Sequence, residues 1–302
     1  MKKKIQINDL RFIKDKNKIL KKKLDDLKLY YRELKDDEYQ EYIFKILHEV
    51  FVKKLTVSGS NRKKVWEEGW EENKKLLNRN KSYSSIIPKY FSKYKVLRMN
   101  NRLIKPLSKN FELKIFHYLQ YYYFNKYLKG IEYIYEFGCG TGQNLKNIRN
   151  VNKDSNIIGL DWSKSSGKII NKYFKNDHKI NYKEFNFFKP DNKFKLYNQS
   201  GIVTIAALEQ TGQNYKKFIN YILKQKPKIC IHIEPINELM DQNNMLDLLS
   251  VLYSRKRNYL DNFLTYLKLI QKNNQIKIIK NERTYLGSLF IEGYSVVIWK
   301  PI

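Results

Sequence analysis

From residue 131 onward, short apolar runs alternate with amphipathic stretches whose apolar residues recur every three or four positions. The alternation predicts strands joined by crossover helices, an arrangement typical of a parallel sheet. The C-terminal stretch, 275–301, instead predicts two strands in a row, which favours an antiparallel pair. We therefore expect an α/β fold with a doubly wound, mostly parallel, seven-stranded sheet. The expected parallel strands lie at 131–137, 156–160, 180–188, 202–206 and 229–233.

Residues 1–110 show a different pattern, in which helical periods and charged residues dominate. Apolar positions spaced by three and four in 19–34 and 39–55 predict two amphipathic helices with solvated lysine faces. The segment around Arg98 and Arg102 shows no clear period and is expected to be irregular. We predict a helical N-terminal cap over 1–110 and an α/β domain over 111–302.

The composition fits a packed protein with a reduced interior. A chain of 302 residues can hold one α/β domain of about 200 residues and a substantial extension. The two cysteines, Cys139 and Cys230, make neither a disulfide framework nor a zinc set. The N-terminus is basic but lacks an apolar signal segment, and no run approaches a membrane span. We expect a soluble, cytoplasmic protein without a membrane span.

The formal charge of +29 permits two interpretations. A strongly basic surface binds polyanions such as RNA without sequence preference. The excess is carried mainly by lysine, however, and asparagine, isoleucine and tyrosine are abundant too, as in proteins from AT-rich genomes. A nucleic-acid partner is therefore possible but not required.

The stretch 131–150, IEYIYEFGCGTGQNLKNIRN, runs from an apolar strand through a glycine-rich turn into a helix. Glu136 lies near the end of the strand, and Gly138, Gly140 and Gly142 follow at alternate positions. Glycines in such a turn let the backbone bend tightly and let a ligand approach. In a dinucleotide-binding G-x-G-x-x-G turn the third glycine would fall at Gln143.

The sequence E-F-G-C-G-T-G resembles the first motif of class I, Rossmann-like, S-adenosylmethionine-dependent methyltransferases. The resemblance covers about residues 111–302 and implies S-adenosyl-L-methionine as cofactor, with S-adenosyl-L-homocysteine as product. It implies that Glu136 binds the cofactor's ammonium, while the 138–142 loop, with Cys139 in it, binds the carboxylate. It also implies that Asp161 holds the ribose hydroxyls, because a carboxylate accepts two hydrogen bonds from a diol. Trp162 and Phe187 would flank the adenine, and Asn186 stands where the family often has an aspartate.

Three side chains at the predicted carboxyl ends of strands are candidates for catalysis: Glu209, His232 and Glu234. Open α/β sheets bind ligands at this edge, and a hydroxyl acceptor benefits from a base there. His232 could equally be a satisfied histidine beside the sheet. Metal binding by His232, Glu234 and Glu238 lacks a recognised spacing, so we expect no metal.

Other residues are candidates for contacting the acceptor. Trp66 and Trp70 are four apart, so a helix puts both rings on one face, near Asn73. They could form a lid over the acceptor, or only dock their segment on the core. Gln210 follows a strand, and a cluster of Arg255, Arg257 and Tyr259 could bind an anionic group or simply be a basic helix face.

Together these features predict a methyltransferase acting on the oxygen or nitrogen of a small-molecule, sugar or peptide side-chain acceptor. The family's N-P-P-Y and D-P-P-Y motifs for base N-methylation are absent. An RNA methyltransferase is the alternative, supported by charge alone. A non-enzymatic interaction module is the third, and the combination of Glu136, the glycine loop and Asp161 argues against it.

Overall fold

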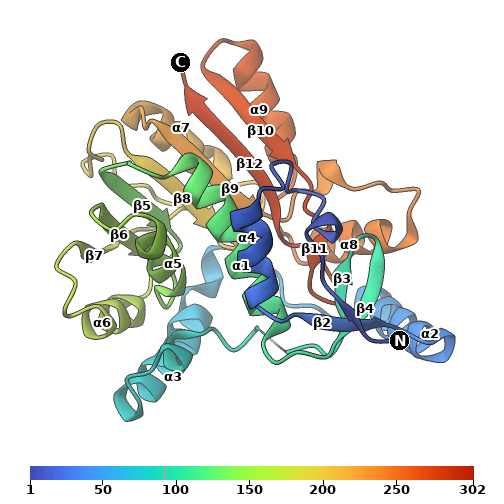
Figure 1. The fold of residues 1–302 in the computed structure, drawn as a ribbon. Coiled ribbons are helices and arrows are strands. Elements are labelled where there is room, and N and C mark those ends of the chain that lie inside the picture. The colour runs from blue at the N-terminus through green and yellow to red at the C-terminus, as the bar shows by residue number, and fades with distance from the viewer. Residues whose placement is uncertain (92) are drawn as a thin grey trace.

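A computed structural model describes residues 1–91 and 93–302. Its main feature is a seven-stranded sheet of order β10-β12-β9-β8-β5-β6-β7 (Figure 1). The strands β5 to β9 are parallel, whereas β12 runs antiparallel to β9 and β10. The expected mostly parallel, seven-stranded sheet is confirmed. The bounds are β5 Tyr133–Phe137, β6 Asn156–Asp161, β7 Ile180–Glu184, β8 Gly201–Ile205, β9 Ile229–Glu234, β10 Ile276–Glu282 and β12 Ser295–Pro301.

Both faces of the central strands of this sheet are buried. Every residue of β8 and β9 is buried, which explains their continuous apolar runs. Alternate strand residues belong to two apolar clusters: Ile134 and Ile231 to one, Tyr135 and Cys230 to the other. The first cluster includes side chains of α4 (Phe111–Tyr127), α5 (Gln143–Val151) and α6 (Lys164–Tyr173). The second includes side chains of α7 (Tyr215–Gln225) and α9 (Phe263–Lys272).

The N-terminal part is not a purely helical cap, because it builds most of a second sheet. This sheet is antiparallel and has the order β1-β2-β4-β3-β11. Helix α1 (Lys18–Asp26) ends early, so residues that continue its apolar period form β2 instead. The segment expected to be irregular forms a hairpin of β3 and β4. The bounds are β1 Lys3–Lys4, β2 Tyr30–Glu33, β3 Leu97–Met99, β4 Arg102–Pro106 and β11 Leu286–Gly287.

A separate apolar core lies beside the second sheet. It joins Ile46 and Val50, which lie in and just after α2 (Asp36–Leu47), to Leu249 of α8 (Met245–Lys256) and Phe290. Residues from both sides of position 110 therefore build this part of the molecule, together with β11. The helical apolar period of 245–271 is divided in the structure between α8 and α9, and Asn262, with φ of +58°, precedes α9.

Helix α3 (Lys63–Arg79) packs against α6 (Figure 1). Its Trp70 and Leu77 lie in one apolar cluster with Ile169 of α6. The Glu67 carboxylate accepts hydrogen bonds from the Ser165 N–H (2.9 Å) and Ser165 Oγ (2.6 Å). These contacts hold α3 beside the carboxyl edge of the main sheet. Within 1–91 and 93–302, no helix is long and apolar enough to cross a membrane.

Candidate active site

The glycine loop turns from β5 into α5 through three residues in the left-handed region. Gly138, Gly140 and Gly142 have φ of +76°, +51° and +79°, where a β-carbon is unfavourable. A β-carbon on Gly138 would lie 2.3 Å from Cβ of Ala207, and one on Gly140 would lie 2.8 Å from the Trp70 ring. A β-carbon on Gly142 would meet Ile170 at 2.8 Å instead, so Gly142 allows close packing against α6.

Asp161 ends β6 and fixes the glycine loop. Its Oδ2 accepts a hydrogen bond from the Gly140 N–H, and its Oδ1 accepts one from the Ser163 N–H, both at 2.9 Å. Burial raises the pKa of this carboxyl to about 6, although the two backbone donors oppose the rise. Each carboxylate oxygen can accept a second hydrogen bond. Asp161 also lines the cavity described next.

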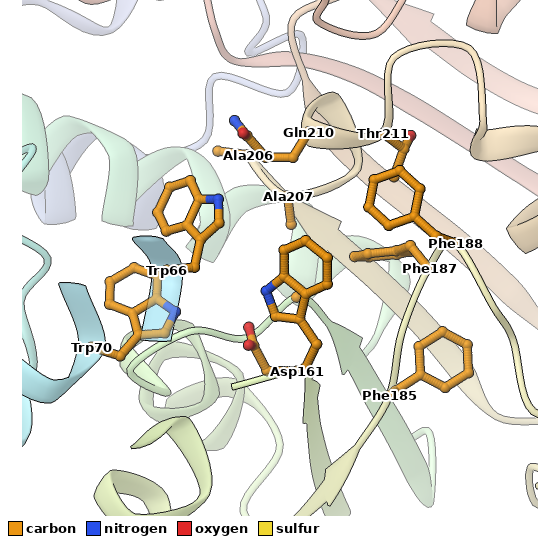
Figure 2. Close-up of a pocket in the computed structure, with 12 residues that line it drawn as sticks. Trp66, Trp70, Asp161, Phe185, Phe187, Phe188, Ala206, Ala207, Gln210 and Thr211 are labelled. Carbon is orange, nitrogen blue, oxygen red and sulfur yellow. The ribbon is translucent and has the colours of Figure 1, made fainter. Parts of the chain in front are cut away.

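A cavity lies where the glycine loop, the end of β6 and the segments after β7 and β8 meet. It contains about 500 Å³ of space between atoms, part of it open to solvent. Trp66 and Trp70 stand on one side, the phenylalanines after β7 stand opposite, and the 206–211 segment crosses between them (Figure 2). The lining residues are Trp66, Trp70, Gly138, Asp161, Trp162, Phe185, Phe187, Phe188, Ala206, Ala207, Gln210 and Thr211.

Half of the residues that line this cavity are aromatic. The two indoles of α3 have ring centroids 5.3 Å apart, and Trp162 stacks on Phe188 at 5.7 Å. Phe185 and Phe188 were not among the residues singled out from the sequence, although the run 185–188 directly follows β7. Ala206, also not anticipated, has φ of +46°, an uncommon conformation for a residue with a β-carbon.

Two residues of the predicted cofactor set turn away from the cavity. Asn186 does not line it, because its Oδ1 accepts a hydrogen bond from the Phe188 N–H at 2.9 Å and closes its own turn. The Cys139 side chain lies in the apolar cluster beneath the loop, where burial raises the pKa of the thiol. Cys139 therefore contributes to the loop through its backbone, whose N–H and carbonyl group are both hydrogen-bonded.

Glu136 lies fully buried in β5, close to the start of α5. Its Oε1 accepts a hydrogen bond from Nδ2 of Asn144 at 2.7 Å. Its Oε2 has no partner within the described part of the chain. Burial raises the pKa of Glu136 to about 8, which the Asn144 contact opposes. An unpaired, buried carboxylate oxygen is costly unless a donor or a positive charge meets it.

His232 is a core histidine, so its assignment as a catalytic residue is corrected. It is fully buried in the middle of β9, against Phe263 on the α7 and α9 side of the sheet. Its Nδ1 lies 2.8 Å from Thr204 Oγ1, and its Nε2 accepts a hydrogen bond from Trp299 Nε1 at 2.9 Å. Burial lowers its pKa to about 3. Both ring nitrogens are thus engaged within the fold, and His232 does not line the cavity.

The two glutamates have different surroundings. The Glu234 carboxylate accepts hydrogen bonds from the backbone N–H groups of Ala207, Leu208 and Glu209 at 3.0–3.2 Å. Glu234 therefore holds the turn that lines the cavity and does not itself face an acceptor. Glu209 is half-buried and accepts a hydrogen bond from Gln210 Nε2 at 3.0 Å. Burial raises the pKa of Glu209 to about 7, which Gln210 and the charge of Arg257 oppose.

The predicted acceptor residues separate into two groups. Trp66, Trp70 and Gln210 line the cavity. Asn73 does not, because its buried amide donates to the carbonyls of Ser85 (2.9 Å) and Ile87 (3.0 Å) and holds that loop on α3. Arg255 is exposed at the end of α8, whereas Arg257 and Tyr259 are half-buried and hydrogen-bonded to each other at 3.0 Å.

Comparison with known proteins gives likenesses of structure only, since the sequence matches no family model and no curated protein. One similar solved structure is an O-methyltransferase from neocarzinostatin biosynthesis, with 12% identity and a TM-score of 0.43 over 64% of this chain and 58% of that one. Another is the N-methyltransferase NodS from Bradyrhizobium japonicum, with 10% identity and a TM-score of 0.49 over 76% and 98%. A third is a small RNA methyltransferase, with 14% identity and a TM-score of 0.47 over 66% and 28%. Identities this low say nothing of the acceptor.

Proposed function

We propose that the chain is an S-adenosylmethionine-dependent methyltransferase. The observation that carries the proposal is the Asp161 carboxylate, hydrogen-bonded to the glycine loop and exposed to a cavity with aromatic walls. A carboxylate suits a ribose diol, and aromatic rings suit an adenine. The arrangement lies at the carboxyl edge of a mostly parallel sheet, where α/β proteins bind their ligands.

The buried groups around the loop fit this cofactor. The unpartnered Oε2 of Glu136 suits an ammonium group, while Gly138 and Gly140 let the loop pass close to Ala207 and Trp70, where a β-carbon would collide. Trp162 and Phe187 would flank the adenine, and Asp161 would hold the ribose. When bound, the cofactor supplies an electrophilic methyl group on a positively charged sulfur. The protein then mainly has to align the acceptor and exclude water.

The acceptor in this proposal is a small molecule, a sugar or a peptide side chain. The indoles of Trp66 and Trp70, held by α3, give an enclosed wall suited to a compact group. Glu209 is the remaining candidate for the base, because His232 and Glu234 are fully engaged elsewhere. A carboxyl whose pKa is raised to about 7 would accept a proton from a hydroxyl acceptor near neutral pH.

Intrinsic fluorescence tests the cofactor assignment directly. Three of the four tryptophans, at positions 66, 70 and 162, line the cavity, and Trp299 is buried in β12. Titration with S-adenosylhomocysteine should change the emission saturably, and NAD should not. Trp162→Phe should remove part of the response, whereas Trp299→Phe should leave it. The proposal would be refuted if neither S-adenosylmethionine nor S-adenosylhomocysteine changed the emission spectrum and calorimetry also detected no binding of them.

RNA remains a second candidate acceptor because the formal charge is +29. Phosphate contacts made by lysine and arginine release counterions, so binding to RNA would weaken steeply with salt. A small acceptor enclosed beside Trp66 and Trp70 would show a much weaker dependence. The salt slope of turnover therefore discriminates between the two acceptor classes.

A further inference from the structure

The segment before α3 is fastened to the turn after α8. Ser58 donates its N–H (2.8 Å) and its Oγ (2.7 Å) to the carbonyl of Arg257. Asn258 Nδ2 donates in return to the Ser58 carbonyl at 3.2 Å. These contacts join chain positions about 200 apart and place the start of α3 next to Arg257 and Tyr259.

Two arginines meet at this junction without a carboxylate in direct contact. Within the described residues, no carboxylate lies within 4.0 Å of the guanidinium of Arg62 or Arg257. Nε is buried and without a hydrogen-bond partner in both side chains. Among the described residues, the only hydrogen bond from either guanidinium is the 3.0 Å contact of Arg257 with the Tyr259 hydroxyl. Burial, and then the positive charge of Arg257, lower the pKa of Arg62.

Such an arrangement is unfavourable for the protein alone. A buried Nε–H without an acceptor carries a desolvation cost, and two positive charges held near one another repel. The neighbouring groups are otherwise well packed: the Arg257 guanidinium lies over the Tyr259 ring at 5.1 Å. An anion between the two arginines would remove both costs. Guanidinium groups bind carboxylates and phosphates in preference to other anions because their planar donors match two oxygens.

The junction lies at the border of the cavity. Arg62 directly precedes α3, one turn before Trp66, which lines the cavity. From the other side, Gln210 lines the cavity and contacts the Tyr259 hydroxyl, and its neighbour Glu209 interacts electrostatically with Arg257. Arg62 and Arg257 therefore each lie next to an element that supplies a lining residue of the cavity.

We propose that Arg62 and Arg257 bind a carboxylate or phosphate group at the distal end of a small methyl acceptor. The proposal rests on the function proposed above and narrows its substrate to an anionic compound. Arg257 and Tyr259 were expected to contact the acceptor, whereas Arg62 replaces the exposed Arg255 in that role. Recognition at a distance from the reacting atom would position the acceptor and leave the chemistry to the groups beside the cofactor.

Anion binding can be measured with inorganic phosphate and with acetate as probes. Thermal unfolding is followed while each anion replaces chloride at constant ionic strength, for the wild type, Arg62→Gln, Arg257→Gln and the double variant. Arg255→Gln is the matched control, because it removes one positive charge from an exposed site on the same helix end. Fluorescence titration with S-adenosylhomocysteine runs in parallel and reports folding and the cofactor site independently.

At least one probe should stabilise the wild type and Arg255→Gln equally, and the preferred probe tells phosphate from carboxylate. Its apparent affinity should fall at least about tenfold in either single variant, with little further loss in the double variant. Without the anion, Arg62→Gln should unfold at a temperature no lower than the wild type, since it removes a half-buried positive charge that is repelled by Arg257.

Other outcomes would overturn the inference. Neither probe stabilising the wild type, while S-adenosylhomocysteine still binds, would refute the anion site and spare the proposed function. Equal losses in all three single variants would show a general surface-charge effect. Binding of an RNA oligonucleotide weakened equally by the three substitutions would likewise make the pair part of a polyanion surface.

Discussion

The carboxylate of Asp161 accepts a hydrogen bond from the backbone N–H of Gly140 at 2.9 Å, across 21 positions of the chain. The end of β6 and the glycine loop after β5 are thereby one structural unit. Because the second oxygen holds the Ser163 N–H, both oxygens need to be acceptors. The residue expected to bind the ribose also sets the shape of the loop beneath it.

Asp161→Asn should therefore weaken cofactor binding more than a lost ribose contact alone. The amide places an NH₂ donor opposite one of two backbone N–H donors, which leaves a buried donor unpaired and costs about 1–3 kcal/mol. We expect S-adenosylhomocysteine affinity to fall at least about tenfold and the unfolding temperature to drop. Calorimetry and thermal unfolding measure the two effects. Normal affinity in this variant would show that the carboxylate is not part of the cofactor site.

Substitutions of glycine should distinguish the effect of backbone strain from the effect of a steric clash. Gly138→Ala puts a β-carbon 2.3 Å from Cβ of Ala207, and Gly140→Val places a side chain against the Trp70 ring. Both should abolish cofactor binding. Gly130→Ala is the control, because Gly130 also has positive φ (+78°) but has open space around its β-carbon position. It should lose about 1–2 kcal/mol of stability and keep cofactor binding. Equal binding losses in all three would leave only strain as the cause.

Cofactor affinity should rise with pH between about 6 and 8. Burial raises the pKa of Glu136 to about 8, so the free protein holds this carboxyl mostly protonated at neutral pH. Binding an ammonium favours the ionised form, so the complex releases a proton. Calorimetry in buffers of different ionisation enthalpy should detect that release, and Glu136→Gln should abolish it while weakening affinity.

Through the same Glu136 carboxyl, a rise in pH should lower the stability of the folded protein. A carboxyl whose pKa is raised in the folded state stabilises the fold below its unfolded pKa of about 4.5. That stability is lost as pH rises through the folded value. Glu136→Gln mimics the protonated form, so its unfolding temperature at pH 8 should exceed that of the wild type by about a few degrees. A lower unfolding temperature would contradict the burial of an unpaired oxygen.

Glu209 and Glu234 should respond differently to the same substitution. Glu209→Gln should fold normally and lose about two to four orders of magnitude in turnover of a hydroxyl acceptor. The rise of wild-type kcat/KM with pH through about 7 should disappear with it. Glu234→Gln should mainly lower the unfolding temperature, because the amide can replace only part of the contacts to three backbone N–H groups. A pH profile unchanged in Glu209→Gln would exclude it as the base.

Salt tests the acceptor class. For an RNA acceptor that contacts several phosphates, kcat/KM should fall by about a thousandfold or more between 50 and 200 mM salt. An acceptor with one anionic group should lose only a few-fold over the same range, since few counterions are released. Initial rates at fixed cofactor concentration measure the slope. A steep slope would favour RNA and remove support from the Arg62–Arg257 site.

The parallel sheet was predictable because its central strands β8 and β9 are buried on both faces and therefore read as almost unbroken apolar runs. The second sheet was not, because β2 continues the apolar spacing of α1 and its strands are short. Only tertiary pairing distinguishes Tyr30–Glu33 from another helical turn. The contribution of β11, two residues long, has no signal in the local sequence.

The site shows the same division between local and long-range information. The glycine loop was predicted from its motif, and Asp161 from its place at the end of a strand. Gly138 and Asp161 line the cavity, and Asp161 also accepts a hydrogen bond from the loop. His232 sits among apolar strand residues, and its partners Thr204 and Trp299 lie on β8 and β12. Asn73 next to two indoles looked suited to an acceptor, yet its amide is used within the fold. Arg62 gained a role only when the Ser58 contacts brought it to Arg257.

The N-terminal part of the fold depends on β11, a short strand that is synthesised near the end of the chain. Its residues 286–287 pair with β3, and the nearby Leu289 and Phe290 complete the core around Ile46. A ribosome must therefore make nearly the whole chain before the first hundred residues can finish folding. The early segment would depend on chaperones or on its own α1 and α2 until then. A fragment beginning at residue 111 would lack the partner of β11 and should aggregate when expressed alone.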